Sequence, residues 1–188
     1  MKATKLDWIN GALEALSDGG VHAVQVESLA RKLGVTKGGF YGYFLNRDAF
    51  LQEVLAYWET ILTDETISLA HMEQGDLHER LTHLLQIVYI RLDEHVDDAI
   101  DNAMTSWSFK DQRVRVVVNR VVRKRIDFIK NIFLEEGFSE EQAELRARLV
   151  HSFVHGDRHY PDTCEALGSA EREKMAQALI DYVCKPQK

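Results

Sequence analysis

Apolar side chains recur every three or four residues along most of the chain, which is the spacing of one face of an α-helix. Thr4 and Asp7 have the spacing of a capping box, and Gly19-Gly20 can end the helix that this box opens. The apolar face of that helix consists of Leu6, Ile9, Leu13 and Leu16. No stretch shows the strict alternation of a strand, so the pattern predicts an all-α protein.

Further helices are predicted wherever the apolar spacing resumes after a glycine or a capping residue. Asn46 can cap a long helix, and Ser139 with Gln142 forms a second capping box. The predicted ranges are 27–33, 47–73, 75–95, 96–106, 111–136, 140–155 and 169–184. Because the helices are short before Asn46 and longer after it, we expect two domains, residues 1–46 and 47–188.

The segment between residues 27 and 44 predicts two short helices joined by a tight turn, which is the helix-turn-helix arrangement. Gly34 suits the turn, because glycine adopts the left-handed conformation without strain. Ala30 is small enough for a second helix to cross close by, and Thr36 can cap that helix. The opposing apolar faces are Leu29 with Leu33, and Val35 with Phe40 and Phe44. An ordinary helical hairpin buried in the protein is the alternative.

The stretch VTKGGFYGYF, residues 35–44, holds three glycines, although glycine is a poor helix former. With its apolar residues turned inward, its outward face carries hydrogen-bond donors and glycines. Donors suit phosphate oxygens, and glycine allows close approach to base edges. We therefore predict that this face binds double-stranded DNA. The candidate contacts are Thr36, Lys37, Gly38, Gly39, Tyr41 and Tyr43, with Arg47 one turn further on.

Charge and composition qualify this prediction. The 188 residues carry a formal net charge of −7, which by itself argues against a nucleic-acid partner. Within residues 1–50, however, basic residues outnumber acidic ones by one, so the acidic excess lies in the rest of the chain. No apolar run reaches the roughly 18 residues of a membrane span. Cys164 and Cys184 lack zinc-ligand spacing, and we expect free thiols in a cytoplasmic protein that does not contact a membrane.

Residues 28–51, SLARKLGVTKGGFYGYFLNRDAFL, closely resemble the DNA-binding segment of the TetR family of transcriptional repressors. The positions that carry the resemblance are Ala30, Gly34, Thr36, Gly38, Phe40-Tyr41, Phe44 and Arg47. The resemblance implies an N-terminal three-helix DNA-binding domain, a helical ligand-binding and dimerisation domain, and about nine helices in all. It further implies a homodimeric repressor that binds palindromic operator DNA and is released when a small-molecule effector binds.

Two candidate contacts depart from the family pattern. Arg47 stands where the family usually has lysine, and both residues bind phosphate, although with different geometry. Gln25 stands near the start of the second helix, where serine or threonine is usual, and joins the predicted DNA contacts. Neither nucleotide motif, G-x-G-x-x-G or G-x-x-x-x-G-K-[ST], occurs, and we expect no cofactor.

Aromatic and methionine side chains gather in the long predicted helices, where pockets between helices are commonly apolar. The candidates for a ligand pocket are Trp58, Met104, Trp107 and Phe128, with His151 at its rim. Filling the core is the alternative role for each apolar member. The last two helices carry apolar stripes, and the resemblance assigns these helices to a dimer interface: Leu145, Leu149 and Phe153, then Met175, Leu179, Ile180 and Val183. A chain of this length can instead bury these stripes internally.

His151, His155 and His159 share one helix face if their helix continues through Gly156. Two histidines at this spacing can hold a metal ion, so an all-helical metal-dependent enzyme is a rival hypothesis. No H-E-x-x-H pattern occurs, and polar packing at the pocket rim or the dimer interface is the interpretation that we favour. A helical interaction protein without DNA activity is a second rival. The pattern overall favours a regulator rather than an enzyme.

Overall fold

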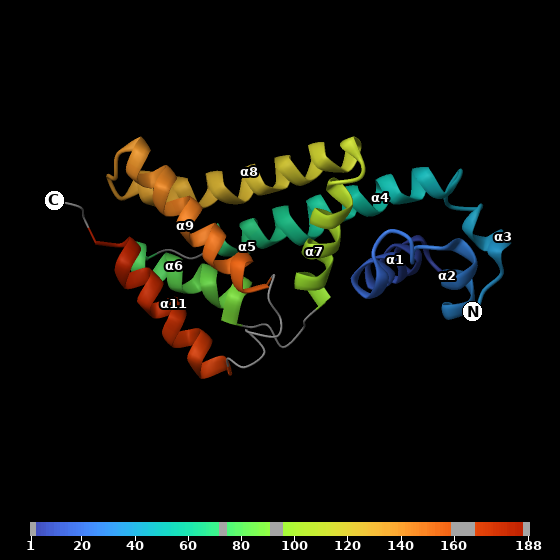
Figure 1. Cartoon of the computed structure of the whole chain (residues 1–188), viewed down its shortest axis with the longest axis horizontal. Coiled ribbons are helices and arrows are strands. Elements are labelled where there is room, and N and C mark those ends of the chain that lie inside the picture. The colour runs from blue at the N-terminus through green and yellow to red at the C-terminus, as the bar shows by residue number, and fades with distance from the viewer. Residues whose placement is uncertain (1–2, 72–74, 91–95, 159–167, 186–188) are drawn as a thin grey trace. The chain divides into compact units, whose positions relative to one another are not determined.

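The computed structural model describes residues 3–71, 75–90, 96–158 and 168–185, and every regular element in these ranges is helical (Figure 1). The all-α prediction is therefore confirmed. The α-helices are α1 Lys5–Gly19, α2 Val26–Lys32, α3 Lys37–Phe40, α4 Arg47–Glu59, α5 Thr66–His71, α6 Leu77–Leu85, α7 Val96–Ser108, α8 Gln112–Glu135, α9 Glu140–Arg158 and α11 Ser169–Val183. Two π-helical segments, η1 Thr60–Glu65 and η2 Gln86–Ile90, complete the set.

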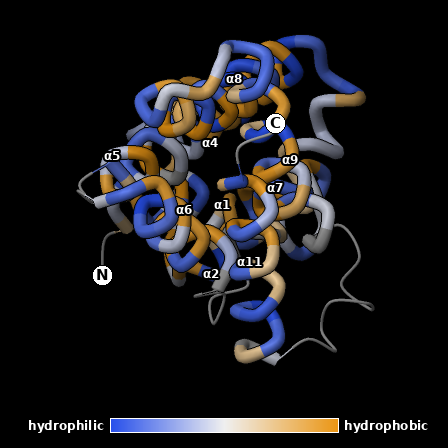
Figure 2. Tube along the Cα trace, turned by 90° about the vertical axis from the view of Figure 1, so that its left-hand side faces the viewer, coloured by the Kyte–Doolittle hydropathy of each residue, from blue (hydrophilic) through white to orange (hydrophobic). Residues whose placement is uncertain are grey.

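The predicted helix starts are confirmed by their hydrogen bonds. The Thr4 hydroxyl accepts a bond from the Asp7 amide, and the Asp7 carboxylate accepts one from the Thr4 amide at 2.7 Å. This capping box satisfies two backbone donors that a helix start would otherwise leave without partners. The same reciprocal pair joins Ser139 and Gln142. Figure 2 shows hydrophobic and hydrophilic positions alternating along the helices, as expected for amphipathic elements.

The helix predicted over residues 47–73 is not uniform. It is interrupted by η1, where one extra residue is accommodated per turn. The burial pattern shows the shift, because buried positions in α4 end at Trp58 and the next buried position among those described is Thr63, five residues later. A similar segment, η2, follows α6. The predicted helix ends at residues 73 and 95 lie outside the described residues.

The first compact unit comprises Met1–Leu62 and His95–Asn119. In it, α1 packs against α7, α4 and α2. An aromatic cluster surrounds Phe40, whose ring centroid lies 5.4 Å from that of Trp8, 5.0 Å from that of Phe44 and 5.2 Å from that of Phe50. Phe40, Phe50 and Trp8 are fully buried. This cluster therefore fixes α3 against α1, through Trp8, and against α4, through Phe50.

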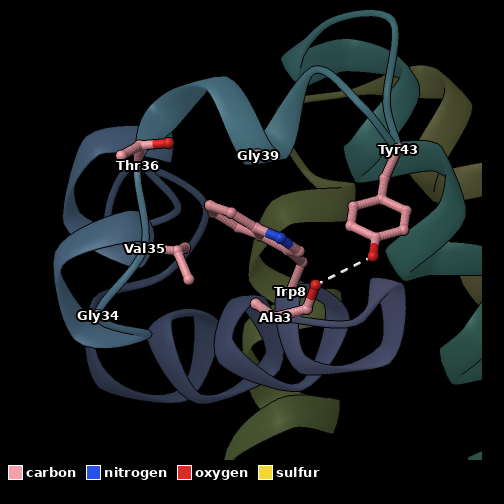
Figure 3. A pocket seen from close by; sticks show the side chains of 7 residues that line it. All are labelled: Ala3, Trp8, Gly34, Val35, Thr36, Gly39 and Tyr43. Atoms are coloured by element: carbon pink, nitrogen blue, oxygen red, sulfur yellow. Dashed lines mark hydrogen bonds between the residues drawn. The ribbon is translucent and has the colours of Figure 1, made fainter. Parts of the chain in front are cut away.

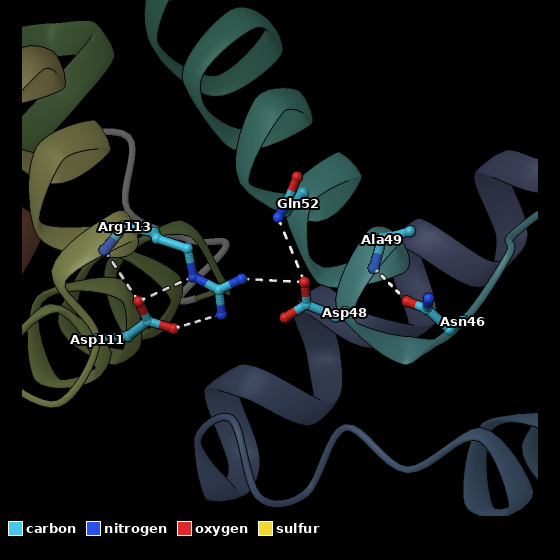
Figure 4. Close-up of polar contacts among 6 residues, drawn as sticks. All are labelled: Asn46, Asp48, Ala49, Gln52, Asp111 and Arg113. Carbon is cyan, nitrogen blue, oxygen red and sulfur yellow. Dashed lines mark hydrogen bonds and ion pairs between the residues drawn. The ribbon is translucent and has the colours of Figure 1, made fainter.

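Polar contacts in the same unit connect the beginning of α4 with that of α8 (Figure 4). Asn46 caps α4 by accepting a bond from the Ala49 amide at 2.8 Å. In the first turn of that helix, the Asp48 carboxylate accepts a bond from Arg113 at 3.0 Å. The Arg113 guanidinium also binds Asp111, and this contact lowers the pKa of the Asp111 carboxyl.

The second compact unit comprises Thr63–Glu94 and Arg120–Lys188. In this unit α11 packs against α6 and η2. Its core gathers large buried side chains from several helices, among them Leu81, Tyr89, Phe133, Val150 and Ile180. The domain boundary expected at Asn46 stays a prediction, because the compact units group residues by contact rather than by order along the chain.

Candidate nucleic-acid interface

The turn between α2 and α3 has the geometry that the sequence predicts. Gly34 has φ +66°, in the left-handed region that favours glycine. The Val35 amide donates to the Ala30 carbonyl at 2.9 Å, which closes the turn. Phe40 and Phe44 are both buried, as their spacing indicates. We refer to residues 3–46, which contain α1 to α3, as the head.

The outward face of α3 is exposed. Thr36, Lys37, Gly38, Gly39 and Tyr41 all present exposed surface. The helix is shorter than the predicted segment, because α3 ends at Phe40 and residues 41–43 form a turn. The glycines explain this difference, since each lowers the helix propensity of the segment. Thr36 precedes α3 as its N-cap residue, but its hydroxyl makes no capping bond.

Lys37 has a partner that sequence reasoning missed. Its ammonium binds the carboxylate of Glu27, which lies in the first turn of α2. The hydrogen bond to Lys37 lowers the pKa of Glu27, and the same bond raises the pKa of Lys37. The two residues are ten positions apart on different helices, so no helical spacing links them, and only the turn brings them together.

Three other predicted contacts already bind backbone carbonyls within the first unit. Arg47 donates to Val24 at 2.8 Å and to Val21 at 2.7 Å, which attaches the start of α4 to the α1–α2 connection. The Tyr43 hydroxyl donates to the Ala3 carbonyl at 3.0 Å. The Gln25 side-chain amide donates to the His22 carbonyl at 3.3 Å. A phosphate would therefore meet these side chains through their remaining donors, or would displace the bonds.

An open pocket of about 720 Å³ lies between the N-terminal segment and α3 (Figure 3). Its lining residues are Ala3, Trp8, Gly34, Val35, Thr36, Gly39 and Tyr43. Trp8 forms part of the wall, and its buried indole N–H has no hydrogen-bond partner among the described residues. No charged side chain lines this pocket.

The predicted ligand-pocket residues are divided between the two units. Trp58, Met104 and Trp107 are buried in the first unit, where the Trp58 indole donates to Asp101 at 2.8 Å. Phe128 and His151 belong to the second unit. There Phe128 packs against the core and meets His71 edge to face, with ring centroids 6.2 Å apart. Their grouping into one pocket stays a prediction.

The predicted dimer residues differ in exposure. Leu145 and Leu149 on α9 are exposed, whereas Phe153 and Leu179 are partly buried against the core of the second unit. Ile180 and Val183 retain only 2% and 1% of their surface, so they are already used in that core. The exposed large apolar side chains of α11 are Met175, which belongs to the predicted stripe, and Tyr182, which does not. The internal use that the sequence left open thus applies to Ile180 and Val183.

His151 and His155 lie together on α9, with ring centroids 4.2 Å apart. His159 lies outside the described residues. Within the described ranges, no group of three or more His, Cys, Asp or Glu side chains is arranged to hold a metal ion. No helix in these ranges is both long enough and apolar enough to cross a membrane.

The chain is similar to known proteins in two ways: a family model matches the N-terminal part of the chain in sequence, and solved structures match the fold of nearly the whole chain. The family model described as bacterial regulatory proteins of the tetR family matches residues 9–54. No curated protein matches the chain in sequence.

Solved structures resemble nearly the whole chain. A transcriptional regulator from Rhodococcus sp. Rha1 has a TM-score of 0.79 and 16% identity, covering 96% of each chain. FadR from Bacillus subtilis, in complex with stearoyl-CoA, has a TM-score of 0.72 and 14% identity, covering 96% of this chain and 97% of its own. A regulator from Saccharomonospora viridis, in complex with choline, has a TM-score of 0.76 and 16% identity over 95% of each chain. At such identities the likeness establishes the fold.

Proposed function

This chain is a member of the tetR family of bacterial regulatory proteins through the domain at residues 9–54, and from this premise we propose that it represses transcription from a palindromic operator. The proposal rests on the exposed face of α3. Buried Phe40 anchors the helix, while Lys37, Gly38, Gly39 and Tyr41 stay exposed beside it. A short helix held this way can enter a major groove without changing its packing.

The contacts divide by chemistry. The ammonium of Lys37 can bind a phosphate oxygen or the acceptors of guanine, and the Tyr41 hydroxyl can donate to phosphate. At Gly39 an added Cβ would meet no atom within 4 Å, so the backbone there leaves room for a base edge. Thr36, Gly38 and Gln25 are further proposed contacts. Tyr43 and Arg47 are proposed contacts as well, and their hydrogen bonds to backbone carbonyls fix the positions of their side chains.

A small-molecule effector is proposed to release the operator. Two regulators of the same fold are in complex with stearoyl-CoA and with choline, which shows that the fold accommodates ligands of different chemistry. The pocket residues proposed in the first unit are Trp58, Met104 and Trp107, all of them buried. Most of these side chains are apolar, which favours an effector with a large apolar part.

A second copy of this chain is the proposed partner. Reading two half-sites of a palindrome requires two recognition helices about 34–36 Å apart, and one chain supplies one such helix. The exposed apolar side chains on α9 and α11 are candidates for the contact: Leu145, Leu149, Met175 and Tyr182. Phe153 and Leu179, which were also predicted to form the contact, are partly buried against the core of the second unit, and Ile180 and Val183 belong to that core.

The test uses duplexes selected by the full chain from a randomised library. A Lys37→Ala/Tyr41→Phe variant keeps the ring that packs on Phe40, with centroids 5.2 Å apart, but loses both polar contacts. We expect its binding to the selected duplex to weaken at least tenfold. Lys32→Ala is the matched control, because Lys32 is an equally exposed head lysine paired with a glutamate, Glu14. Unchanged affinity of the double variant, measured by fluorescence anisotropy, would contradict the assignment.

A further inference from the structure

This inference rests on the DNA-binding function proposed above and concerns how the head chooses its sequence. Its starting point is the position of Glu27. The carboxylate of Glu27 binds the ammonium of Lys37, and Lys37 is the first residue of α3 on the proposed DNA face. Glu27 therefore brings a negative charge to the same face. The side chains of Glu27 and Lys37 are 60% and 49% exposed, so DNA can reach both.

Both groups are charged near neutral pH. Their shared hydrogen bond lowers the pKa of Glu27 and raises the pKa of Lys37, and Tyr41 is the other titratable group close enough to affect Lys37. In the unbound head, the cation predicted to meet DNA is thus neutralised by a neighbouring anion. An exposed pair of this kind contributes little to folding stability.

When the head contacts a duplex, Lys37 either leaves Glu27 to bind the DNA or stays paired with Glu27. If Lys37 leaves Glu27 for the DNA, a carboxylate without its cation is left among phosphates, which it repels. If Lys37 stays, the head loses one positive contact. A carboxylate can accept a hydrogen bond in the major groove from the N4 amino group of cytosine. A cytosine in reach therefore replaces Lys37 as the partner of Glu27 and frees Lys37 for a neighbouring guanine or phosphate.

We propose that Glu27 is a specificity-determining residue that reads a cytosine in each half-site and penalises duplexes without one. Selection then works partly by exclusion, because wrong sequences leave either the carboxylate or the lysine without a DNA partner. This explains how a face with few long side chains discriminates between bases. The glycines allow the backbone of α3 to approach the base edges closely, and the Glu27–Lys37 pair favours a duplex with cytosine at the right position.

The chain offers a matched control for removing this charge. Glu14 on α1 binds Lys32 on α2, and the side chains of this pair are 49% and 53% exposed. None of the proposed DNA contacts takes part in that pair. Glu27→Gln and Glu14→Gln therefore each remove one exposed carboxylate from the head and leave a lysine unpaired, but only the first alters the proposed DNA face.

The experiment selects duplexes from a randomised library of roughly 30 base pairs, long enough for two half-sites. Wild type, Glu27→Gln and Glu14→Gln are selected separately as full chains. For Glu27→Gln we expect the preference for cytosine at one position per half-site to fall roughly 5- to 10-fold. On a scrambled duplex, its affinity should show a salt dependence steeper by about 0.9 per subunit, because Lys37 is free to bind phosphate. Glu14→Gln should match the wild type in both measurements.

Thermal unfolding of the three proteins at the same midpoint temperature would verify that both variants fold like the wild type. Retention of every base preference by Glu27→Gln would overturn the inference, as would an equal gain in affinity on all sequences. Equal effects of Glu14→Gln would also overturn it, because the cause would then be the overall charge of the head. If the wild type shows no salt-dependent duplex binding at all, the proposed function fails as well, so the two failures are distinguishable.

Discussion

At the scale of single residues, glycine suits position 34 and position 39 for two different physical reasons. An added Cβ meets no atom within 4 Å at either position, but Gly34 has φ +66°. We expect Gly34→Ala to destabilise the protein by about 1–2 kcal/mol, because the left-handed conformation strains any Cβ. Gly39→Ala should raise stability by roughly 0.5–1 kcal/mol while weakening DNA binding. Urea unfolding of both variants measures the difference, and equal midpoints would contradict it.

Cys184 illustrates how partial burial controls reactivity. Burial, together with the nearby carboxylate of Asp181, raises the pKa of its thiol to about 11. Since the thiolate is the reactive form, little of it is present at neutral pH. We expect iodoacetamide to label Cys184 at pH 8 roughly two-hundredfold more slowly than a free cysteine peptide, a factor that follows from a pKa near 8.5 in the peptide. Peptide mapping measures this site separately from Cys164. Labelling at the rate of the peptide would be inconsistent with a buried thiol.

At the scale of elements, Arg47 decides how α4 attaches to the head. Its two bonds to Val24 and Val21 use the planar fork of the guanidinium, which lysine lacks. We expect Arg47→Lys to lower the free energy of unfolding by about 1–2 kcal/mol although it keeps the charge. If Arg47 acted mainly as a phosphate contact, Arg47→Lys would keep both stability and affinity. Thermal unfolding, compared with the salt dependence of duplex binding, separates the two roles.

The elements also show what the sequence could and could not predict. Helix starts were predictable because capping is local, as Thr4 with Asp7 demonstrates. The spacing of Phe40 and Phe44 likewise predicted which face of α3 is buried. The π-helical segment η1 was not predictable, since its extra residue leaves only a small shift in the apolar period. Glu27 was missed because its partner lies on another helix, and Arg47 was assigned to phosphate because its charge is visible in sequence but its backbone bonds are not.

At the scale of the whole molecule, the proposed dimer depends on an exposed apolar surface. We expect Leu149→Glu with Tyr182→Glu to shift the chain to a monomer, since charges buried between two copies would lack partners. Leu69→Glu on α5 is the matched control, because Leu69 is an apolar side chain of the second unit that is not among the proposed contact residues, and its exposure of 56% lies between those of Leu149 and Tyr182. Sedimentation velocity reports the assembly. A double variant that sediments like the wild type would show that α9 and α11 do not form the contact.

The distribution of paired charges over the molecule predicts how stability depends on pH. Partners lower the pKa of five carboxyl groups below their ordinary values of 3.8 or 4.5: Asp7, Glu27, Asp111, Glu144 and Asp181. Each stabilises the fold fully above its ordinary pKa, and this contribution is lost as pH falls through the lower value of the folded state. Partners raise the pKa of Lys32, Lys37 and Lys130 above 10.5, so their contribution is lost only as pH rises beyond that value.

We therefore expect the urea midpoint to stay nearly constant between about pH 5 and pH 8 and to fall on both sides. The five carboxyl groups govern the acid side. On the alkaline side the loss begins with Cys184, because the unfolded chain loses its thiol proton at a lower pH than the folded chain does. Asp7→Asn tests one of them, because the amide cannot lose a proton while its oxygen can still accept from the Thr4 backbone. Relative to wild type, this variant should be less stable near neutral pH but should lose less stability between about pH 5 and pH 3. A midpoint that falls equally steeply in both proteins would show that the capping carboxylate contributes no pH-dependent stability, and that acid unfolding has its source elsewhere in the molecule.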